Sequence, residues 1–579
     1  MLEATSLLAE QFGFAAGVLR ALWVLAGFGL ILTLILAWYH GEKGAQRVSG
    51  PELIIITILL GIAGGVLWVI NRPEIDTGVP TSGSAVRGEA ASPEVSPYLA
   101  SIAVLPLQNL GPAEDRYLGQ GFADELITQL AQIPRLKVSS WTSVSALEGA
   151  NLTLPEIADT LGVDHILEGS IRRSGHTTRI TVQLIEARTD AHLWASSFDR
   201  ELDNLFEVQE EIAQQTLSAL FERVPGLRPT SAGSRTSQGE AYQAYLQGRY
   251  AVHHRTREDL SEAIESFAKA IRIDPGFAPA YSGLGAAYGL WLRYGYPSEI
   301  GEYRMAGQAL AAVDYALSLD PENGEAYAAR AWVKTLAWAP LEEIDADFRK
   351  ALALLPNSTD AHGWHGHYLV RAGMFGGALA EATKAIELDP LAPGRRVGLS
   401  IDALGMGRFD LAVQEAERAL TLEPSLDTAE FSRGIALLLL GRYGECLEAE
   451  VGPHLAVRAM CLSSLDRTDE AAEIVDDLAS AVEAGNTSDL SVSRSTVIRD
   501  LSVYFAWVGE IEESLRYLDL AFEGTPYGVD FRLWASGVYD RVTASPQSAL
   551  RYTAAAEEAW NRVAHERDRA SPGIPESLF

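Results

Sequence analysis

Cysteine is nearly absent from this chain of 579 residues, which contains only Cys446 and Cys461. Two cysteines cannot build a disulfide framework or a multi-cysteine zinc site, so we interpret them as a pair of small buried residues. Basic residues are also scarce, since 46 Lys and Arg stand against 77 Asp and Glu, for a formal net charge of -31. Phosphate contacts need clustered Lys and Arg, so this charge disfavours nucleic-acid binding. It suits a neutral or basic protein partner, or it merely keeps a helical array soluble.

The sequence also lacks the motifs that mark common enzymes. Gly283, Gly285 and Gly289 follow no strand and precede no P-loop lysine, so we interpret them as spacers between helices and not as a phosphate loop. The chain shows no nucleophile elbow. We therefore predict that it is not an enzyme and that it has no catalytic, cofactor-binding or metal-binding residues.

What the chain does have is proline at regular intervals, usually after an acidic residue. The pairs are Asp274-Pro275, Asp320-Pro321, Asp389-Pro390 and Glu423-Pro424, with Leu355-Pro356 as a variant. From Pro321 onward the prolines recur with a period of about 34 residues, which is typical of tetratricopeptide repeats. In such repeats two antiparallel helices bury their apolar faces only by stacking on neighbouring pairs. Half of the chain is therefore predicted to be a binding solenoid.

The repeat also holds within each unit. The unit that begins at Ala278 has the large-large-small-large spacing that lets two helices approach closely. Its residues are Tyr281, Leu284, Gly285 and Tyr288. The interval from Pro275 to Pro321 is longer than the others and predicts a turn-rich insertion around residues 293–302. Beyond Pro424 the pattern weakens. We expect five regular units and two or three degenerate ones, of which the last is a cap.

The amino-terminal segment, residues 1–72, has a different composition. Residues 21–39 and 53–70 are uncharged apolar stretches, each just long enough to cross a hydrocarbon layer about 30 Å thick as a helix. Trp and Tyr lie near the ends of both stretches, where their rings favour the membrane-water interface. We therefore predict a two-helix transmembrane anchor. A cleaved signal peptide is the competing interpretation of the first stretch, but no small-residue cleavage pattern follows it.

The charges beside these stretches predict an orientation. Lys43 and Arg47 make the connecting loop slightly more basic than either flank. The positive-inside rule then places the loop in the cytoplasm and both ends outside. The expected localisation is the inner, or plasma, membrane of a bacterium, with the soluble domains in the periplasm.

An α/β segment follows a tether rich in Pro, Ser, Gly and Ala. Residues 101–107 have the apolar, β-branched composition of a buried strand. The periodicity beyond them predicts the order β-α-β-α-β-β-β and a closing helix over residues 204–223. Asp124 and Glu125 fall on the first helix of this segment, where we interpret them as charges on a surface helix.

Several stretches of this segment resemble a known domain. They include Ile102-Ala-Val-Leu-Pro-Leu-Gln-Asn-Leu, Phe122-Ala-Asp-Glu-Leu-Ile-Thr, Ile166-Leu-Glu-Gly-Ser-Ile-Arg-Arg and His192-Leu-Trp-Ala. They look like the TolB amino-terminal-like domain, also called FlgO-like, over residues 100–223. A large bacterial group joins a membrane segment, this domain and tetratricopeptide repeats, often behind a winged-helix, adenylate cyclase or kinase effector. The apolar stretch from residue 21 leaves no room for such an effector, so we do not carry over its activities.

A histidine cluster, His362-Gly-Trp-His365-Gly-His367, is the best candidate for a metal pair, because its first two histidines share a helical face. They fall at repeat positions 4 and 7, which normally pack, so we favour packing over metal binding. The concave face of the solenoid, lined by the first helix of each unit, is expected to bind a protein or peptide partner. The exploratory candidates for this role are Tyr327, Arg330, His362, His365, Arg396 and Arg433.

The predicted fold class is therefore multidomain, with a transmembrane hairpin, an α/β TolB-N-like domain and an all-α tetratricopeptide-repeat solenoid. In chain order we expect a membrane anchor at 1–72, a linker at 73–99, the α/β domain at 100–223, a linker at 224–240, repeats at 241–528, and a helical cap and tail at 529–579. The predicted function is a membrane-anchored scaffold or receptor for a protein or peptide. The alternative is a sensory or regulatory subunit that acts on a separate transcriptional, kinase or cyclase effector.

Overall fold

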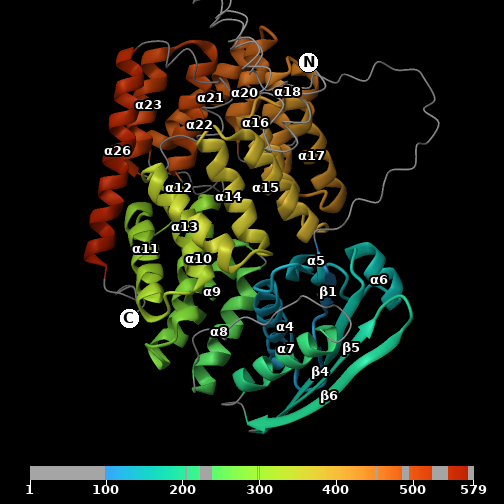
Figure 1. Ribbon diagram of the computed structural model, residues 1–579. Helices are drawn as coiled ribbons and strands as arrows, with labels where there is room; N and C mark the ends of the chain where they lie inside the picture. Colours follow the sequence, from blue (N-terminus) through green and yellow to red (C-terminus); the bar gives the residue numbers. More distant parts are fainter. Residues whose placement is uncertain are drawn as a thin grey trace, which may run out of the picture. The chain divides into compact units, whose positions relative to one another are not determined.

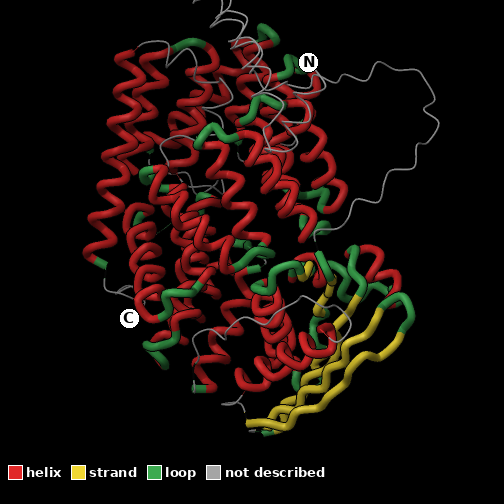
Figure 2. Tube along the Cα trace, in the orientation of Figure 1, coloured by secondary structure: helices red, strands yellow, loops and turns green. Residues whose placement is uncertain are grey.

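The computed structural model describes residues 98–201, 205–221, 236–449, 454–484, 494–524 and 546–570, except for residues 176, 237, 254, 297 and 299. Val95–Phe579 forms one compact unit, in which a sheet with its helices precedes a long array of helices (Figure 1). The described strands all belong to the sheet, and the other regular elements of the described residues are helices (Figure 2).

The predicted membrane hairpin needs correction. Its two apolar stretches, residues 21–39 and 53–70, lie outside the described residues. Within the part of the chain that the structure describes, no helix is both long and apolar enough to cross a membrane. The hairpin and the inner-membrane localisation with periplasmic domains are therefore unsupported. The fold class that the structure shows is a mostly helical repeat solenoid with a small sheet domain.

The sheet combines parallel and antiparallel strands. Its order is β3-β1-β4-β5-β6, and β2 pairs with β4. Strand β1 is parallel to both β3 and β4, whereas β5 is antiparallel to β4 and β6. The elements are β1 (Ala100–Val104), β2 (Gln108–Asn109), α4 (Arg116–Ala131), β3 (Leu136–Val138), α5 (Trp141–Ser145), α6 (Leu154–Leu161), β4 (His165–Ser174), β5 (Thr177–Glu186), β6 (Ala191–Glu201) and α7 (Leu205–Phe221).

The burial of each strand follows its place in the sheet. Every residue of β1 is buried, because the strand has neighbours on both sides and α4 packs against it. Along most of β5 buried and exposed residues alternate, since one face of the antiparallel part packs on helices and the other faces solvent. The predicted order of strands and helices is confirmed, with the short β2 and α5 added to it.

Eight antiparallel helical pairs follow within the described residues, and a last helix packs mainly on the second helix of the second pair and also on the second helix of the eighth pair. The pairs are α8 (Gly239–Val252) with α9 (Arg257–Ile273), α10 (Ala278–Tyr294) with α11 (Glu302–Leu319), α12 (Gly324–Leu336) with α13 (Leu341–Leu354), α14 (Thr359–Arg371) with α15 (Phe375–Leu388), α16 (Pro393–Gly405) with α17 (Phe409–Leu422), α18 (Asp427–Leu439) with α19 (Tyr443–Glu448), α20 (Leu455–Ser464) with α21 (Thr468–Glu483), and α22 (Arg494–Val508) with α23 (Ile511–Gly524). The last helix is α26 (Pro546–Arg569).

The prolines set the ends of the second helices. In the first five pairs the second helix ends immediately before the residue that precedes proline, and that residue has φ between -127° and -142°. Proline disfavours the helical conformation in the residue before it, so the helix stops there. Between α10 and α11, Gly285 allows close approach, because a Cβ at this position would lie 2.3 Å from the Val313 Cγ1 atom. The predicted insertion is confirmed as the gap between Tyr294 and Glu302.

The interpretation of the two cysteines is wrong in one respect. Cys446 and Cys461 are both buried, as expected, but they form a disulfide with a Cα–Cα distance of 6.3 Å. The bond joins the short α19 to α20, across a sequence separation of 15. A pair of cysteines that are far apart in a sequence gives no sign that two helices will bring their Cα atoms within bonding range.

Candidate functional site

A polar site lies where the sheet domain meets the repeats. Helix α4 packs on the sheet with one side and on α8, the first helix of the repeats, with another. Asp124 and Glu125 on α4 are therefore only 3% and 8% exposed. Their interpretation as charges on a surface helix is wrong, because the repeats cover the helix that carries them.

The sheet domain also docks on the turns between repeat units. The Asn357 side chain, which follows one of the regular prolines, donates to the carbonyl oxygens of Ala131 and Ile133 over 3.3 and 3.0 Å. The Ser143 hydroxyl of α5 donates to Asp389 Oδ1 over 2.7 Å, and the Leu391 backbone N–H donates to the same hydroxyl. The turns that define the repeat in the sequence are thus also the docking points of the sheet domain.

A first group of charges centres on Arg249, in the last turn of α8. Its Nε lies 2.6 Å from Asp124 Oδ2, and its Nη1 lies 2.6 Å from Glu325 Oε1 in the first turn of α12. Its Nη2 donates to the Thr128 hydroxyl. His253 Nε2 lies 3.0 Å from Asp124 Oδ1, without the alignment of a hydrogen bond. We call Asp124, Arg249 and Glu325 the acidic triad, because two carboxylates flank one guanidinium.

A second group centres on Asp360, in the first turn of α14. Its Oδ1 lies 2.6 Å from Arg395 Nη2 and 3.2 Å from Arg255 Nη2. We call Arg255, Asp360 and Arg395 the basic triad. Behind it, Arg395 Nε lies 3.4 Å from the buried Asp389. Acidic residues at the beginning of a helix and basic residues at its end are favoured by the helix dipole, which suits Glu325, Asp360 and Arg249 to these positions.

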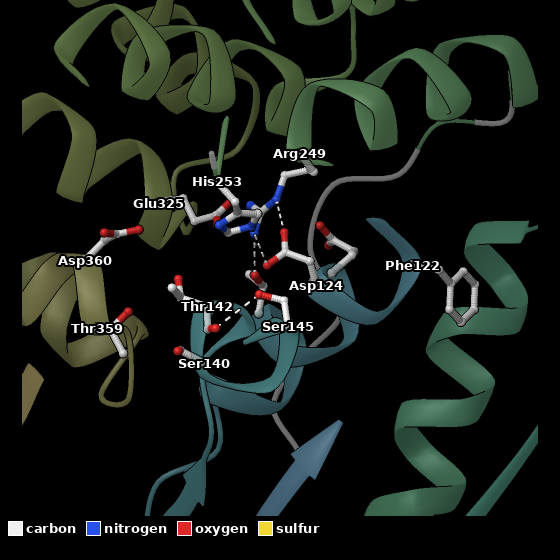
Figure 3. Close-up of polar contacts among 12 residues, drawn as sticks. Phe122, Asp124, Ser140, Thr142, Ser145, Arg249, His253, Glu325, Thr359 and Asp360 are labelled. Carbon is white, nitrogen blue, oxygen red and sulfur yellow. Dashed lines mark hydrogen bonds and ion pairs between the residues drawn. The ribbon is translucent and has the colours of Figure 1, made fainter. Parts of the chain in front are cut away.

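Both triads line one cavity of about 80 Å³. A second cavity of similar size adjoins it on the repeat side and shares Arg249, Arg255, Glu325 and Asp360 with it. Figure 3 shows the acidic triad together with His253, whereas Asp360 and Thr359 lie apart from them across the site. Thr142 and Ser140, from the sheet domain, lie below the acidic triad in this view.

The pKa values of two acids of this site shift in opposite directions. Burial by itself raises the pKa of Asp124, but Arg249 and His253 outweigh it and lower that pKa to about 2. For Glu125 burial dominates and raises the pKa to about 7, although Arg249 opposes it. Glu125 accepts a hydrogen bond of 2.7 Å from the Tyr245 hydroxyl. Two neighbouring carboxyl groups thus differ in protonation near neutral pH.

The six partner-binding candidates lie elsewhere, on the first helices of the third to sixth pairs. Each contacts a charged group of the solenoid. Arg330 binds Asp347 of α13 and Asp314 of α11, and its guanidinium lies over the Tyr327 ring with 5.3 Å to the centroid. Arg433 binds Glu430 on its own helix.

The other three candidates make contacts of the same kind. Both His362 Nδ1 and His365 Nδ1 lie near the Glu381 carboxylate of α15, at 2.5 and 3.3 Å. Arg396 Nη1 lies 3.0 Å from Glu415 of α17. The structure thus places the six candidates along the solenoid and leaves them outside the cavity; partner binding by them stays a prediction.

Some of the acidic residues in these contacts recur at fixed positions of the repeat. The acids on the second helices, Asp347, Glu381 and Glu415, recur at the same position of three successive repeats. Glu325 and Asp360 are likewise the second residues of their helices, one repeat apart. Such periodic polar residues could have been found as one row. Arg249 and Asp124, in contrast, have no repeat relationship.

Comparison with known proteins finds a similar domain for the sheet domain. A family model described as "HilA/YgeH-like transcriptional regulator, second domain" matches residues 98–215. The chain is 33% identical over 197 residues to the "Putative adenylate cyclase 3" of Rhizobium meliloti. This match covers 34% of each of the two chains. It is 22% identical over 336 residues to the "Transcriptional regulator HilA" of Salmonella typhimurium, covering 56% of this chain and 57% of the regulator.

Among solved structures, a tetratricopeptide-repeat protein of Thermus thermophilus is similar with 20% identity and a TM-score of 0.29; the match covers 34% of this chain and 99% of that one. This chain spans a third to somewhat more than half the length of the two curated relatives. The TolB amino-terminal-like, or FlgO-like, assignment is not supported, since the sheet domain matches a regulator domain instead. The relative named as a cyclase leaves the absence of enzyme activity a prediction.

Proposed function

We propose that this chain is a regulatory interaction protein whose repeats bind a protein or peptide partner. The observation that carries the proposal is the stack of eight described helical pairs, which presents one row of first helices along the solenoid. Repeat solenoids use such extended rows as binding faces. The net charge of -31 favours a neutral or basic partner.

A regulatory role is supported by the relatives of the chain. The sheet domain matches the second domain of a transcriptional regulator, and the curated relatives are named as a regulator and as a putative cyclase. We infer that the output is transcription or a cyclic nucleotide, and that a separate protein produces it. In a deletion strain, a changed transcript profile or cyclic nucleotide level is expected, whereas loss of a complex with neither output changed would favour a pure scaffold.

The partner is found by placing a photo-crosslinking amino acid at single positions of the full chain in cells. Tyr327, Arg396 and Arg433 test the first helices, and Arg349 on α13, with a side chain 73% exposed, is the control. The proposal predicts adducts with one common protein from the first-helix positions and none from the control. Adducts from the control alone, or none at any first-helix position, would contradict the proposal.

Once the partner is known, two arginines separate binding from folding. Arg396 and Arg418 both pair with the buried Glu415, the first from the first helix and the second from the second helix. We expect R396A to weaken partner binding at least about tenfold, as truncation of an interface anchor does. R418A removes a comparable ion pair and is expected to leave the affinity, measured by calorimetry, unchanged. If both substitutions lower the affinity equally, the loss comes from a less stable solenoid and not from a lost contact with the partner.

A further inference from the structure

The cavity at the junction has walls of opposite charge. The acidic triad carries two carboxylates and one guanidinium, so its formal charge is negative. The basic triad carries two guanidiniums and one carboxylate, so its formal charge is positive. All six side chains line the same cavity. Asp389 accepts from Arg395 Nε through Oδ2 and from the Ser143 hydroxyl through Oδ1, but it does not line the cavity.

The triads keep hydrogen-bonding groups unused among the described residues. Glu325 accepts from Arg249 through Oε1, and no described group bonds to its Oε2. Asp360 receives both arginines on Oδ1 and none on Oδ2. Arg395 donates through Nε and Nη2, which leaves Nη1 without an acceptor in the described chain. The Glu325 side chain is 30% exposed and that of Asp360 is 39% exposed, so a small molecule can reach them.

The position of the cavity in the fold also suits a ligand. It lies beyond the carboxyl end of β3 and is lined there by Val138, Ser140 and Trp141. In open α/β sheets, ligands bind outside the carboxyl ends of parallel strands. The indole of Trp141 gives this wall an apolar surface, and the adjoining cavity adds Leu290 and Trp364 on the repeat side. The volume of about 80 Å³ in each cavity limits the ligand to a small one.

We propose that this cavity binds a small zwitterion of the free α-amino acid class. Its ammonium group would lie at Glu325, and its carboxylate at Arg395 and Arg255. A simple amine would leave Arg395 Nη1 without an acceptor, and a simple carboxylate would leave Glu325 Oε2 without a donor. Only a molecule with both charges matches both walls.

Such a ligand would join the two parts of the compact unit. The sheet domain contributes Asp124 and Trp141 to the cavity, and the repeats contribute Glu325, Asp360 and Arg395. Occupancy therefore stabilises the docked arrangement of sheet and repeats. This inference does not rest on the proposed partner binding, and a failure of either leaves the other standing.

The test is isothermal titration calorimetry on the full chain. The probes are the individual free α-amino acids and, for each one that binds, its decarboxylated amine and its N-acetyl derivative. We expect at least one amino acid to bind with 1:1 stoichiometry, and both derivatives to bind at least about tenfold more weakly. The absence of binding by every amino acid at millimolar concentration would overturn the proposal, and so would an amine that binds as tightly as its amino acid.

A substitution locates the site. Glu325→Gln keeps an oxygen for Arg249 but removes the charge that faces the ammonium group, so it is expected to lower the affinity at least about tenfold. Glu322→Gln, an exposed change in the turn that precedes α12, is the matched control and is expected to leave the affinity unchanged. Melting curves of both variants check that they fold. A folded Glu325→Gln variant with unchanged affinity would place the ligand elsewhere and contradict the proposal.

Discussion

At the scale of single residues, Arg249 is the central charge of the junction. Its side chain is 12% exposed and bridges Asp124, whose side chain is 4% exposed, to Glu325 of the repeats. A buried ion pair contributes little beyond well-packed apolar groups, but removal of one partner leaves an uncompensated buried charge. Arg179 and Asp199 on β5 and β6 form a pair of similar length whose side chains are 64% and 52% exposed, and so offer a comparison.

Replacement of these two arginines by methionine should therefore have very different effects. We expect R249M to lower the free energy of unfolding by about 3 kcal/mol or more, because Asp124 stays buried and loses its partner. R179M should change it by less than about 1 kcal/mol, since solvent screens the exposed pair. Urea unfolding of both variants measures the difference. Similar small losses of unfolding free energy in both variants would show that the repeats do not bury Asp124.

Glu125 predicts a dependence of stability on pH. Its pKa rises from an ordinary 4.5 to about 7 in the folded chain, so the folded state binds the proton more tightly than the unfolded state. The resulting stabilisation is fully present below pH 4.5 and is lost as the pH rises through 7. A shift of this size corresponds to about 3 kcal/mol.

The comparison that isolates this group is the wild type against Glu125→Gln, at pH 5 and pH 8. The wild type should lose stability over this range relative to the variant, whose neutral amide does not titrate. Asp124, with a pKa of about 2, stays charged throughout and does not contribute. If urea unfolding gives the same difference in free energy of unfolding between the two proteins at pH 5 and at pH 8, Glu125 has no raised pKa.

At the scale of helices and strands, much of the fold could be predicted because it depends on local patterns. The period of about 34 residues, the helix ends before proline and the insertion near Gly295 all depend on neighbouring residues. Local sequence does not decide what covers a helix. For this reason the charges of α4 indicated a surface helix, although the repeats bury it.

The candidate site could not be predicted for the same physical reason. Asp124 and Arg249 are separated by 125 positions in the sequence, and Ser143 and Asp389 by 246. Nothing in the chain between such residues constrains them to meet, because contact depends on how the sheet domain packs on the solenoid. The regular spacing of Glu325 and Asp360 could have been recognised in the sequence. Their pairing with particular arginines could not.

At the scale of the whole compact unit, the central claim is that sheet domain and repeats act as one body. Asn357 is the most direct link, since its buried side chain donates to the last carbonyl of α4 and to the Ile133 carbonyl just beyond it. Asn357→Ala leaves the Ala131 and Ile133 carbonyls without this donor. Ser358→Ala, the next residue, removes the N-cap of α14, at a cost of about 1 kcal/mol, and takes away no hydrogen bond to the sheet domain.

Hydrogen–deuterium exchange on the full chain and these two variants tests this claim most directly. We expect Asn357→Ala to speed exchange both in α4 and α5 and in the repeat turns around residues 355–358 and 388–392, because the two sides separate together. Ser358→Ala should speed exchange only at the start of α14. If α4 and α5 keep their wild-type protection in Asn357→Ala while the repeat turns lose theirs, the sheet domain and the repeats are independent and the account is wrong.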